Sequence, residues 1–367
     1  MCNIIMSNVI YSHIYYLYHN HINKTLIIMH SYLKKVIFDN GGAISVEQFM
    51  RIALYDMNCG YYMTQMPFGV FGDFVTSPEI SQLFGEVIAL WVLLYWEKMG
   101  SPSKFVLLEL GPGRGTLISD IIRVLKKFKQ CYSAVDIYLL EVSPKLQEVQ
   151  YNTLQDVGEK VLWCRNINSI PNYPILVIAN EFFDALPIKQ FICISDSWYE
   201  RYITVEDNKF RFINKLIDKN FQILNVNNIN DPIIEVCDDA ISIIKLIEHK
   251  ILQNKGAAVI IDYGYIDPPY KSTMQSVKNH QYNNIFENVG NSDITVHVDF
   301  TALRKSLSFL NSYIMTQRDF LYNFGIRERL QILIENATEV QQQNLMTGFL
   351  RLTENMGSMF KVLLINP

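Results

Sequence analysis

The stretch "VLLELGPGRGTLISDII", residues 106–122, joins an apolar run to a glycine-rich turn and then to a helical pattern. An uninterrupted run of Val, Ile and Leu is typical of a strand that is buried on both faces of a sheet. Further apolar runs of this kind alternate with helical patterns between residues 104 and 265. Strands that alternate with helices form parallel, doubly wound sheets with right-handed crossovers. The sequence therefore predicts an α/β fold.

Other regions flank this alternating core. Residues 1–30 are rich in Asn and aromatic side chains and predict an N-terminal extension without order of its own. Residues 31–100 have mostly helical periodicity and contain a long loop rich in glycine and aromatic residues. Residues 198–232 have the alternation of hairpins and predict an insertion, or cap, within a domain formed by 101–367. The C-terminal "SMFKVLLINP" predicts a last antiparallel strand at the edge of the sheet.

Charge and cysteine content exclude several classes of protein. The chain has 367 residues, a formal net charge of −4 and a pI near 6.0, which does not match the basic surface of a nucleic-acid-binding protein. Six scattered cysteines without a CxxC pair predict reduced thiols, with no disulfide framework and no metal site. No apolar run reaches the roughly 18 residues of a membrane-spanning helix.

The N-terminus has neither the basic start of a secretory signal nor the arginines of an organellar leader, since the first arginine is Arg51. This predicts a bacterial cytoplasmic protein, or a protein of the mitochondrial matrix if the source is eukaryotic.

The glycine-rich turn predicts a cofactor site. Gly111, Gly113 and Gly115 have the spacing GxGxG, and Thr116 occupies the position where a dinucleotide site has its third glycine. This departure disfavours NAD and flavins. An acid before such a turn, here Glu109, is typical of S-adenosyl-L-methionine sites. The glycines let the backbone approach the ligand, and a carboxylate at the strand end suits the positive charge of this cofactor.

Acidic side chains also follow the next strands. Glu141 comes after a strand beside the glycine turn, where a carboxylate accepts hydrogen bonds from ribose hydroxyls. Asn180 ends the strand "ILVIAN", and Glu181 and Asp184 follow at the edge where open α/β sheets bind ligands. These carboxylates suit a cationic acceptor such as a guanidinium, although Asn180 and Asp184 would also serve as caps of the turn. His297 is either a general base or a core histidine.

Six segments together resemble the MidA-like family of S-adenosylmethionine-dependent methyltransferases, whose mitochondrial members are protein-arginine methyltransferases that assist assembly of respiratory complex I. The resemblance runs from Gly41 to the C-terminus. It rests on the segments "GYYMTQMPFGVFGDFVTSPEISQLFGEVIALW", "LELGPGRGTLISDIIR", "LLEVSPKLQEVQ", "VIANEFFDALPIKQF", "IIDYGY" and "DITVHVDFTAL".

The resemblance implies a class I, Rossmann-like methyltransferase fold of seven strands, with an N-terminal helical region and an inserted cap. It also implies that the loop "FGDFVTSPE" closes over the cofactor. The candidate cofactor-binding residues are Gly72, Asp73, Thr76, Glu109, Gly111, Gly113, Gly115, Glu141 and Asn180. The candidate catalytic residues are Glu181, Asp184 and His297.

The expected function is transfer of a methyl group from S-adenosyl-L-methionine to an arginine of a protein partner, such as a complex I subunit whose assembly the transfer aids. A methyltransferase for a small molecule is one alternative, and it would need an insertion that encloses a small pocket. A non-catalytic assembly chaperone is another, and an intact glycine turn argues against it. An NAD-dependent oxidoreductase is disfavoured by Thr116.

Overall fold

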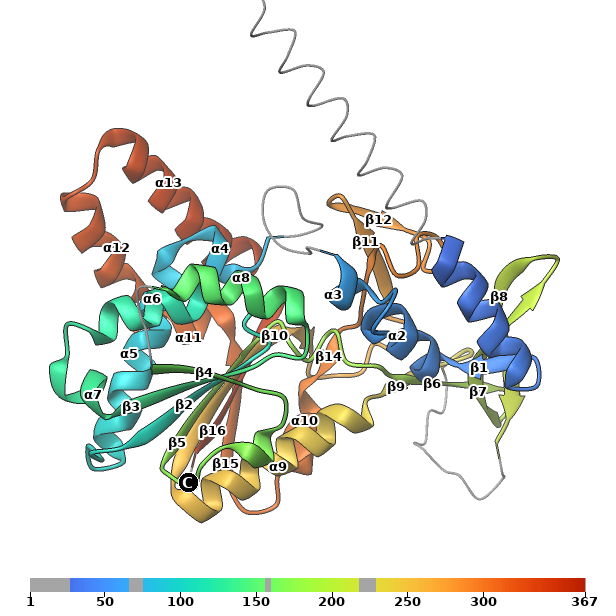
Figure 1. The fold of residues 1–367 in the computed structure, drawn as a ribbon, viewed down its shortest axis with the longest axis horizontal. Coiled ribbons are helices and arrows are strands. Elements are labelled where there is room, and N and C mark those ends of the chain that lie inside the picture. The colour runs from blue at the N-terminus through green and yellow to red at the C-terminus, as the bar shows by residue number, and fades with distance from the viewer. Residues whose placement is uncertain (1–26, 66–74, 156–159, 218–228, 367) are drawn as a thin grey trace, which may run out of the picture. The chain divides into compact units, whose positions relative to one another are not determined.

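The structure is a computed structural model that describes residues 27–65, 75–155, 160–217 and 229–366 (Figure 1). The chain divides into two compact units. The first unit comprises residues 1–67, 187–236 and 270–294, and the second comprises residues 68–186, 237–269 and 295–367.

The second unit is built on an eight-stranded sheet. Seven strands follow one another in the order β15-β16-β10-β5-β2-β3-β4, and β14 pairs with β10. All neighbours from β4 to β10 are parallel, which confirms the predicted α/β fold. In that order the strands are β15 (Asn311–Thr316), β16 (Phe360–Asn366), β10 (Gly256–Tyr265), β5 (Ile175–Asn180), β2 (Phe105–Leu110), β3 (Val135–Leu140) and β4 (Val161–Cys164), with β14 at Val298–Asp299.

The C-terminal strand β16 is antiparallel to its neighbours, as predicted, but the prediction that it forms the sheet edge is wrong. It lies between β10 and β15, and β15 forms the edge. The apolar run of β16 is almost entirely buried, whereas β15 carries polar side chains and is partly exposed. Burial of apolar surface thus favours β16 for the interior position.

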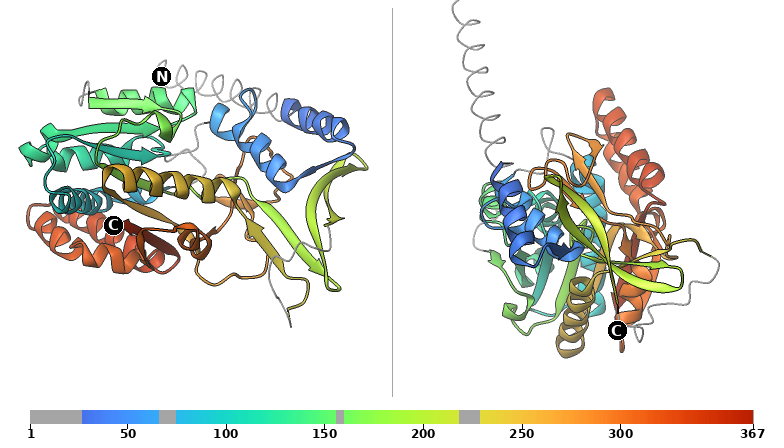
Figure 2. Two further views of the ribbon diagram at one scale, coloured as in Figure 1. Left: turned by 90° about the horizontal axis from the view of Figure 1, so that it is seen from below. Right: turned by 90° about the vertical axis from the view of Figure 1, so that its right-hand side faces the viewer.

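Two layers of helices cover this sheet (Figures 1 and 2). One face packs against α5, α6, α11 and α12, and the other packs against α9 and α10. Successive strand residues contribute to opposite faces: Phe105 and Leu107 belong to the first core, Val106 and Leu108 to the second. The helices of this unit are α4 (Ser77–Ile80), α5 (Gln82–Lys98), α6 (Thr116–Leu125), α7 (Lys129–Ala134), α8 (Pro144–Leu154), α9 (Asp238–Asn254), α10 (Phe300–Ser306), α11 (Gln317–Asn323), α12 (Ile326–Glu335) and α13 (Glu339–Leu350), with a 3-10 turn at Ile167–Ser169 and a π-helical turn at Arg351–Asn355.

The first unit contains a mainly antiparallel sheet and a short three-stranded sheet. The larger sheet has the order β1-β7-β6-β9, with β8 paired to β7, and the smaller has the order β12-β11-β13. A helix over 27–39 belongs to this unit. Its other elements are β1 (Ala43–Ser45), α2 (Val46–Tyr55), α3 (Tyr61–Thr64), β6 (Lys189–Ile194), β7 (Ser197–Glu206), β8 (Lys209–Leu216), β9 (Ile233–Val236), β11 (Gln275–Lys278), β12 (Gln281–Asn283) and β13 (Asp293–Thr295).

The predicted domain limits differ from the limits of these units. The predicted helical region, 31–100, is divided, because α2 and α3 belong to the first unit and α5 packs on the sheet of the second. The predicted insertion, 198–232, contains the β7–β8 hairpin, but its sheet also includes β6 and the distant strand β1. Most of the predicted extension, 1–30, lies outside the described residues.

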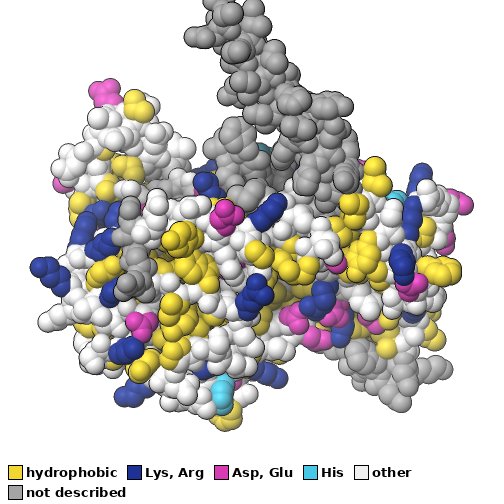
Figure 3. All heavy atoms as spheres, in the orientation of Figure 1, with side chains coloured by type: hydrophobic (Ala, Val, Ile, Leu, Met, Phe, Trp, Pro, Cys, Tyr) yellow, Lys and Arg dark blue, Asp and Glu magenta, His cyan; other side chains and the backbone are white. Residues whose placement is uncertain are grey.

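The molecular surface shows no concentration of one charge on the face drawn in Figure 3, where acidic and basic side chains are interspersed. Over the described ranges, no helix is both long enough and apolar enough to cross a membrane.

Candidate active site

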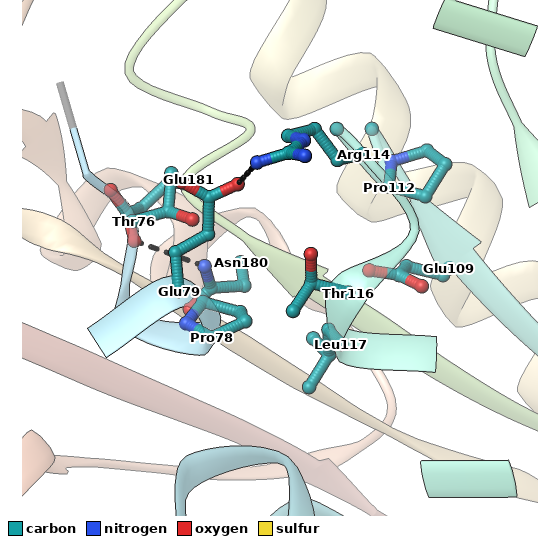
Figure 4. Close-up of a pocket in the computed structure, with 12 residues that line it drawn as sticks. Thr76, Pro78, Glu79, Glu109, Pro112, Arg114, Thr116, Leu117, Asn180 and Glu181 are labelled. Atoms are coloured by element: carbon teal, nitrogen blue, oxygen red, sulfur yellow. Dashed lines mark hydrogen bonds and ion pairs between the residues drawn. The ribbon is translucent and has the colours of Figure 1, made fainter. Parts of the chain in front are cut away.

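A pocket opens at the carboxyl ends of β2 and β5, and the described residues that line it all belong to the second unit. Figure 4 shows Glu109 and Thr116 on one side and Asn180 and Glu181 on the other. The lining residues are Thr76, Pro78, Glu79, Glu109, Gly111, Pro112, Gly113, Arg114, Thr116, Leu117, Asn180 and Glu181.

The glycine turn has a backbone that other residues adopt with difficulty. Gly111, Gly113 and Gly115 have φ angles of +62°, +55° and +81°, all in the left-handed region. At Gly111 an added Cβ would also lie 2.7 Å from Cδ2 of Phe182. Gly115 is the N-cap of α6, so the turn ends where the helix leaves the sheet edge. The three glycines are therefore required by the shape of the turn that borders the pocket.

Two buried oxygen atoms in this pocket have no hydrogen-bond partner among the described residues. They are Oε2 of Glu109, whose side chain is 3% exposed, and Oδ1 of Asn180. Burial raises the pKa of Glu109 to about 8. Because buried polar atoms are normally hydrogen-bonded in folded proteins, these two acceptors point to a ligand that carries donors.

Glu141 does not line the pocket but lies beside the glycine turn. Its Oε1 accepts a hydrogen bond from the backbone N–H of Ser143 at 2.8 Å, and its Oε2 accepts one from Nε2 of Gln150 at 3.0 Å. Nε2 of Gln150 also donates to the carbonyl of Gly113 at 2.8 Å, and Oε1 of Gln150 accepts from Trp163 at 2.8 Å. Burial raises the pKa of Glu141. Gln150 thus joins this carboxyl to the glycine turn.

The turn after β5 brings Glu181 into the pocket. Glu181 has a φ of +49°, which is uncommon for a residue with a side chain. Its Oε1 accepts hydrogen bonds from the backbone N–H of Ser77 at 2.9 Å and from Nδ2 of Asn180 at 3.1 Å. Burial, with a smaller effect of the charge on Asp184, raises the pKa of Glu181 to about 7.

Asp184 lies behind this turn in a second group of polar side chains. Its Oδ2 accepts a hydrogen bond from the hydroxyl of Tyr263 at 2.6 Å, and burial raises its pKa to about 6. Asp262, on β10, is fully buried, and its Oδ2 accepts hydrogen bonds from the backbone N–H groups of Phe183 and Asp184 at 3.0 and 3.2 Å. Burial and the charges of Asp184 and Glu181 raise the pKa of Asp262 well above its usual value.

His297 belongs to this second group rather than to the pocket lining. Its ring makes an edge-to-face contact with Tyr263, with 5.4 Å between the ring centroids. Thr76 lines the pocket, whereas Gly72 and Asp73 lie outside the described residues.

The family of the chain follows from comparison with known proteins. Residues 87–314 match the model of a family described as "Putative S-adenosyl-L-methionine-dependent methyltransferase". The chain belongs to this methyltransferase family.

Curated relatives of this methyltransferase cover most of its length. The mitochondrial protein arginine methyltransferase NDUFAF7 of Xenopus laevis is 35% identical over 360 residues, which cover 89% of this chain and 82% of that protein. The human NDUFAF7 protein is 32% identical over 356 residues, which cover 89% of this chain and 80% of that protein.

A solved structure matches the fold of the methyltransferase. A protein from Burkholderia thailandensis, crystallised with S-adenosyl-homocysteine, has a TM-score of 0.82 at 23% identity, with 95% of this chain and 94% of that chain covered. The predicted class I methyltransferase fold is therefore confirmed, and the family confirms S-adenosyl-L-methionine as the cofactor.

Several residues at or beside the candidate site are not among those predicted from the sequence. Asp262 follows the apolar run in "GAAVIID", and this position is the pattern by which it could have been identified as a strand-end acid. Gln150 lies within α8 among other polar residues, without a distinguishing pattern. Arg114 and Glu79 are 35 residues apart in the sequence, and only the folded chain brings them together at the pocket.

Proposed function

We propose that this methyltransferase transfers a methyl group from S-adenosyl-L-methionine to a guanidinium nitrogen of an arginine in a protein acceptor. The observation that carries the proposal is the group of buried carboxyls formed by Glu181, Asp184 and Asp262. A bound cation favours the ionised form of these carboxyls, and carboxylates bind guanidinium groups through paired hydrogen bonds. The relatives from Xenopus laevis and human are named protein arginine methyltransferases, which supports the same acceptor.

The cofactor side of the proposal uses the glycine turn, Glu109 and Asn180. Their unpartnered acceptors fit the ammonium of the methionine portion, and the three glycines leave room for the backbone to approach the ligand. We propose Glu141 as the acceptor for ribose hydroxyls, because an ionised carboxylate has several acceptor sites and can bind further donors besides Ser143 and Gln150. Thr76 completes this set, and Gly72 and Asp73 stay predictions. When bound, the cofactor supplies an electrophilic methyl group on a sulfonium.

The acceptor side uses Glu181 and Asp184 to orient a guanidinium. Methyl transfer needs alignment of the reacting atoms more than acid–base chemistry, so rigid placement is the main task of these residues. Glu181 is held by Ser77 and Asn180, and Asp184 by Tyr263. His297 stays a candidate for taking up the proton that the nitrogen loses, and its contact with Tyr263 brings it near Asp184.

We further propose a subunit of respiratory complex I as the acceptor protein, with the reaction aiding assembly of the complex. The curated relatives are mitochondrial proteins, which supports the mitochondrial matrix for a eukaryotic source. The cytoplasm is the corresponding compartment for a bacterial source.

The test is a methylation assay with the purified chain, methyl-labelled S-adenosyl-L-methionine and dissociated complex I subunits, read by mass spectrometry. We expect labelled methylarginine in one subunit, and a large loss of the label with Glu181→Gln or Asp184→Asn. Asp267→Asn, an exposed acid of the same unit, is the control and should retain activity. Label in a small guanidino compound, with none in any protein, would contradict the protein acceptor.

The pH dependence gives a second test of Glu181. Because its pKa is raised to about 7, Glu181 is largely neutral at pH 6 and attracts a cationic acceptor only as the pH rises. Arginine itself stays protonated throughout. We expect kcat/KM for the acceptor to rise with pH and to level off above about 7. In Glu181→Gln the rise of kcat/KM with pH should be lost. If the variant has the same pH dependence as the original chain, Glu181 does not bind the acceptor.

A further inference from the structure

We propose that Arg114 binds the carboxylate of the amino-acid portion of the cofactor and leaves an ion pair with Glu79 in order to do so. The inference rests on the cofactor part of the proposed function and is independent of the acceptor. Arg114 belongs to the glycine turn but is not one of the cofactor-binding residues predicted from the sequence. The inference gives it a role in cofactor specificity.

The position of Arg114 is the first argument. It lies between Gly113 and Gly115, and its side chain is 46% exposed, so its guanidinium reaches the pocket from the rim. Nη1 of Arg114 lies 3.5 Å from Oε1 of Glu79, at the outer limit of a hydrogen bond, and this contact extends across the pocket in Figure 4. A long and partly exposed ion pair contributes little to stability, so a ligand can displace it at small cost.

The distribution of charge in the pocket is the second argument. S-Adenosyl-L-methionine carries an ammonium and a carboxylate on one carbon atom. Oδ1 of Asn180, and Glu109 and Glu181 in their ionised forms, attract the ammonium and repel the carboxylate. Arg114 is the one cationic side chain among the described residues that line the pocket. The carboxylate therefore has a single partner of opposite charge here, and a guanidinium can bind it through two parallel hydrogen bonds.

Glu79 acts in this proposal as a competitor for Arg114. Its side chain is 11% exposed and lies in α4, opposite the glycine turn. Before the cofactor binds, Glu79 holds the guanidinium over the pocket. Removing the charge of Glu79 should therefore favour the carboxylate of the cofactor, whereas removing Arg114 should leave that carboxylate without a partner.

The experiment compares two ligands by calorimetric titration: S-adenosyl-homocysteine and its decarboxylated form, 5′-S-(3-aminopropyl)-5′-thioadenosine. We expect the chain to prefer the ligand with the carboxylate by about 10- to 100-fold, the range for charge-assisted hydrogen bonds. Arg114→Gln should abolish this preference and leave the affinity for the decarboxylated ligand nearly unchanged. Arg114→Lys, which keeps the charge but loses paired hydrogen bonding, should retain part of it.

Two further variants complete the test. Glu79→Gln should bind S-adenosyl-homocysteine more tightly and the decarboxylated ligand equally well. Arg304→Gln, an exposed arginine in the last turn of α10, is the matched control and should keep the full preference. An unchanged preference in Arg114→Gln, or equal binding of both ligands by the original chain, would overturn the inference. Binding of neither ligand by the original chain would instead contradict the proposed function.

Discussion

Glu109 combines burial, an unpartnered oxygen and a place in the pocket lining. Its pKa is raised to about 8, so the free protein holds a proton on this carboxyl at pH 7. A cation bound beside it favours the ionised form and releases that proton.

We expect cofactor binding at pH 7 to release close to one proton, because the pKa of Glu109 falls when an ammonium binds. Calorimetric titration of S-adenosyl-homocysteine in buffers of different ionisation enthalpy measures this number. Glu109→Gln should bind more weakly and release no proton. If the original chain and Glu109→Gln release the same number of protons, Glu109 does not contact the cation.

We propose Gln150 as a positioning residue for the cofactor site, because its amide joins Gly113, Glu141 and Trp163. Gln150→Leu should weaken binding of S-adenosyl-homocysteine by about 10-fold or more, since the carboxyl of Glu141 and the glycine turn each lose a hydrogen bond that holds them. Calorimetric titration measures the loss in affinity.

The control for Gln150 is Gln147, which lies on the same helix and whose side-chain amide donates to the backbone carbonyl of Glu141 rather than to its carboxyl. Gln147→Leu should bind the ligand nearly as well as the original chain. Equal losses in the two variants would mean that general damage to α8, rather than loss of positioning, weakens binding.

Three helices of the second unit meet at one buried carboxylate. Glu86 of α5 is 1% exposed, and its Oε1 accepts hydrogen bonds from Arg123 of α6 at 2.6 Å and from Arg329 of α12 at 3.2 Å. Burial alone would raise the pKa of Glu86, but the hydrogen bonds from Arg329 and Arg123 outweigh it and lower the pKa. The contact therefore stabilises the layer of helices on this face of the sheet.

We expect Glu86→Leu to lower the free energy of unfolding by about 3 kcal/mol, at the low end for a broken buried ion pair because both arginines remain partly exposed. Urea unfolding at pH 7 measures the change.

The lowered pKa of Glu86 also makes its contribution to stability depend on pH. The contribution is complete above the unfolded pKa, about 4.5, and it is lost as the pH falls below that value. Glu97→Leu on an exposed part of α5 should change stability by less than about 0.5 kcal/mol. Equal effects of the two variants would contradict the role of Glu86.

The described residues that line the pocket and the aromatic residues around Phe286 belong to different units. In that unit, Phe286 contacts the rings of Phe49, Phe210 and Phe212, with centroid distances of 5.8, 6.2 and 5.0 Å. The described residues that line the pocket belong to the other unit. Stability of the first unit and cofactor affinity should therefore respond to different substitutions.

We expect Phe286→Ala to lower the free energy of unfolding by about 2 kcal/mol, because a partly buried aromatic ring leaves its packing. The Kd of the folded protein for S-adenosyl-homocysteine should stay unchanged. Tyr282→Ala, at a ring that is 77% exposed in the same segment, is the control for both measurements. A weaker Kd in Phe286→Ala alone would show that the pocket depends on the first unit.

Local patterns in the sequence determined the class of fold and the edge of the sheet at which the candidate site lies. Buried strands, the glycine spacing and the acids at Glu109, Glu181 and Asp184 could be predicted because the carboxyl ends of parallel strands meet at one edge of a sheet. The residues at this edge can be read from the sequence, because each comes directly after the apolar run of a strand. The direction of a side chain within a turn cannot be read in this way. Glu141, for example, lies beside the pocket and does not line it.

Only the tertiary structure decided which distant residues act together. The contacts between Arg114 and Glu79, between Gln150 and Glu141, and of Asp262 with the turn after β5 join separate elements. The internal place of β16 and the limits of the two units likewise depend on pairing between distant segments. The periodicity of apolar residues shows which face of a segment is buried. Contacts between distant segments leave no regular spacing in the sequence, so they depend on the three-dimensional packing of the whole chain.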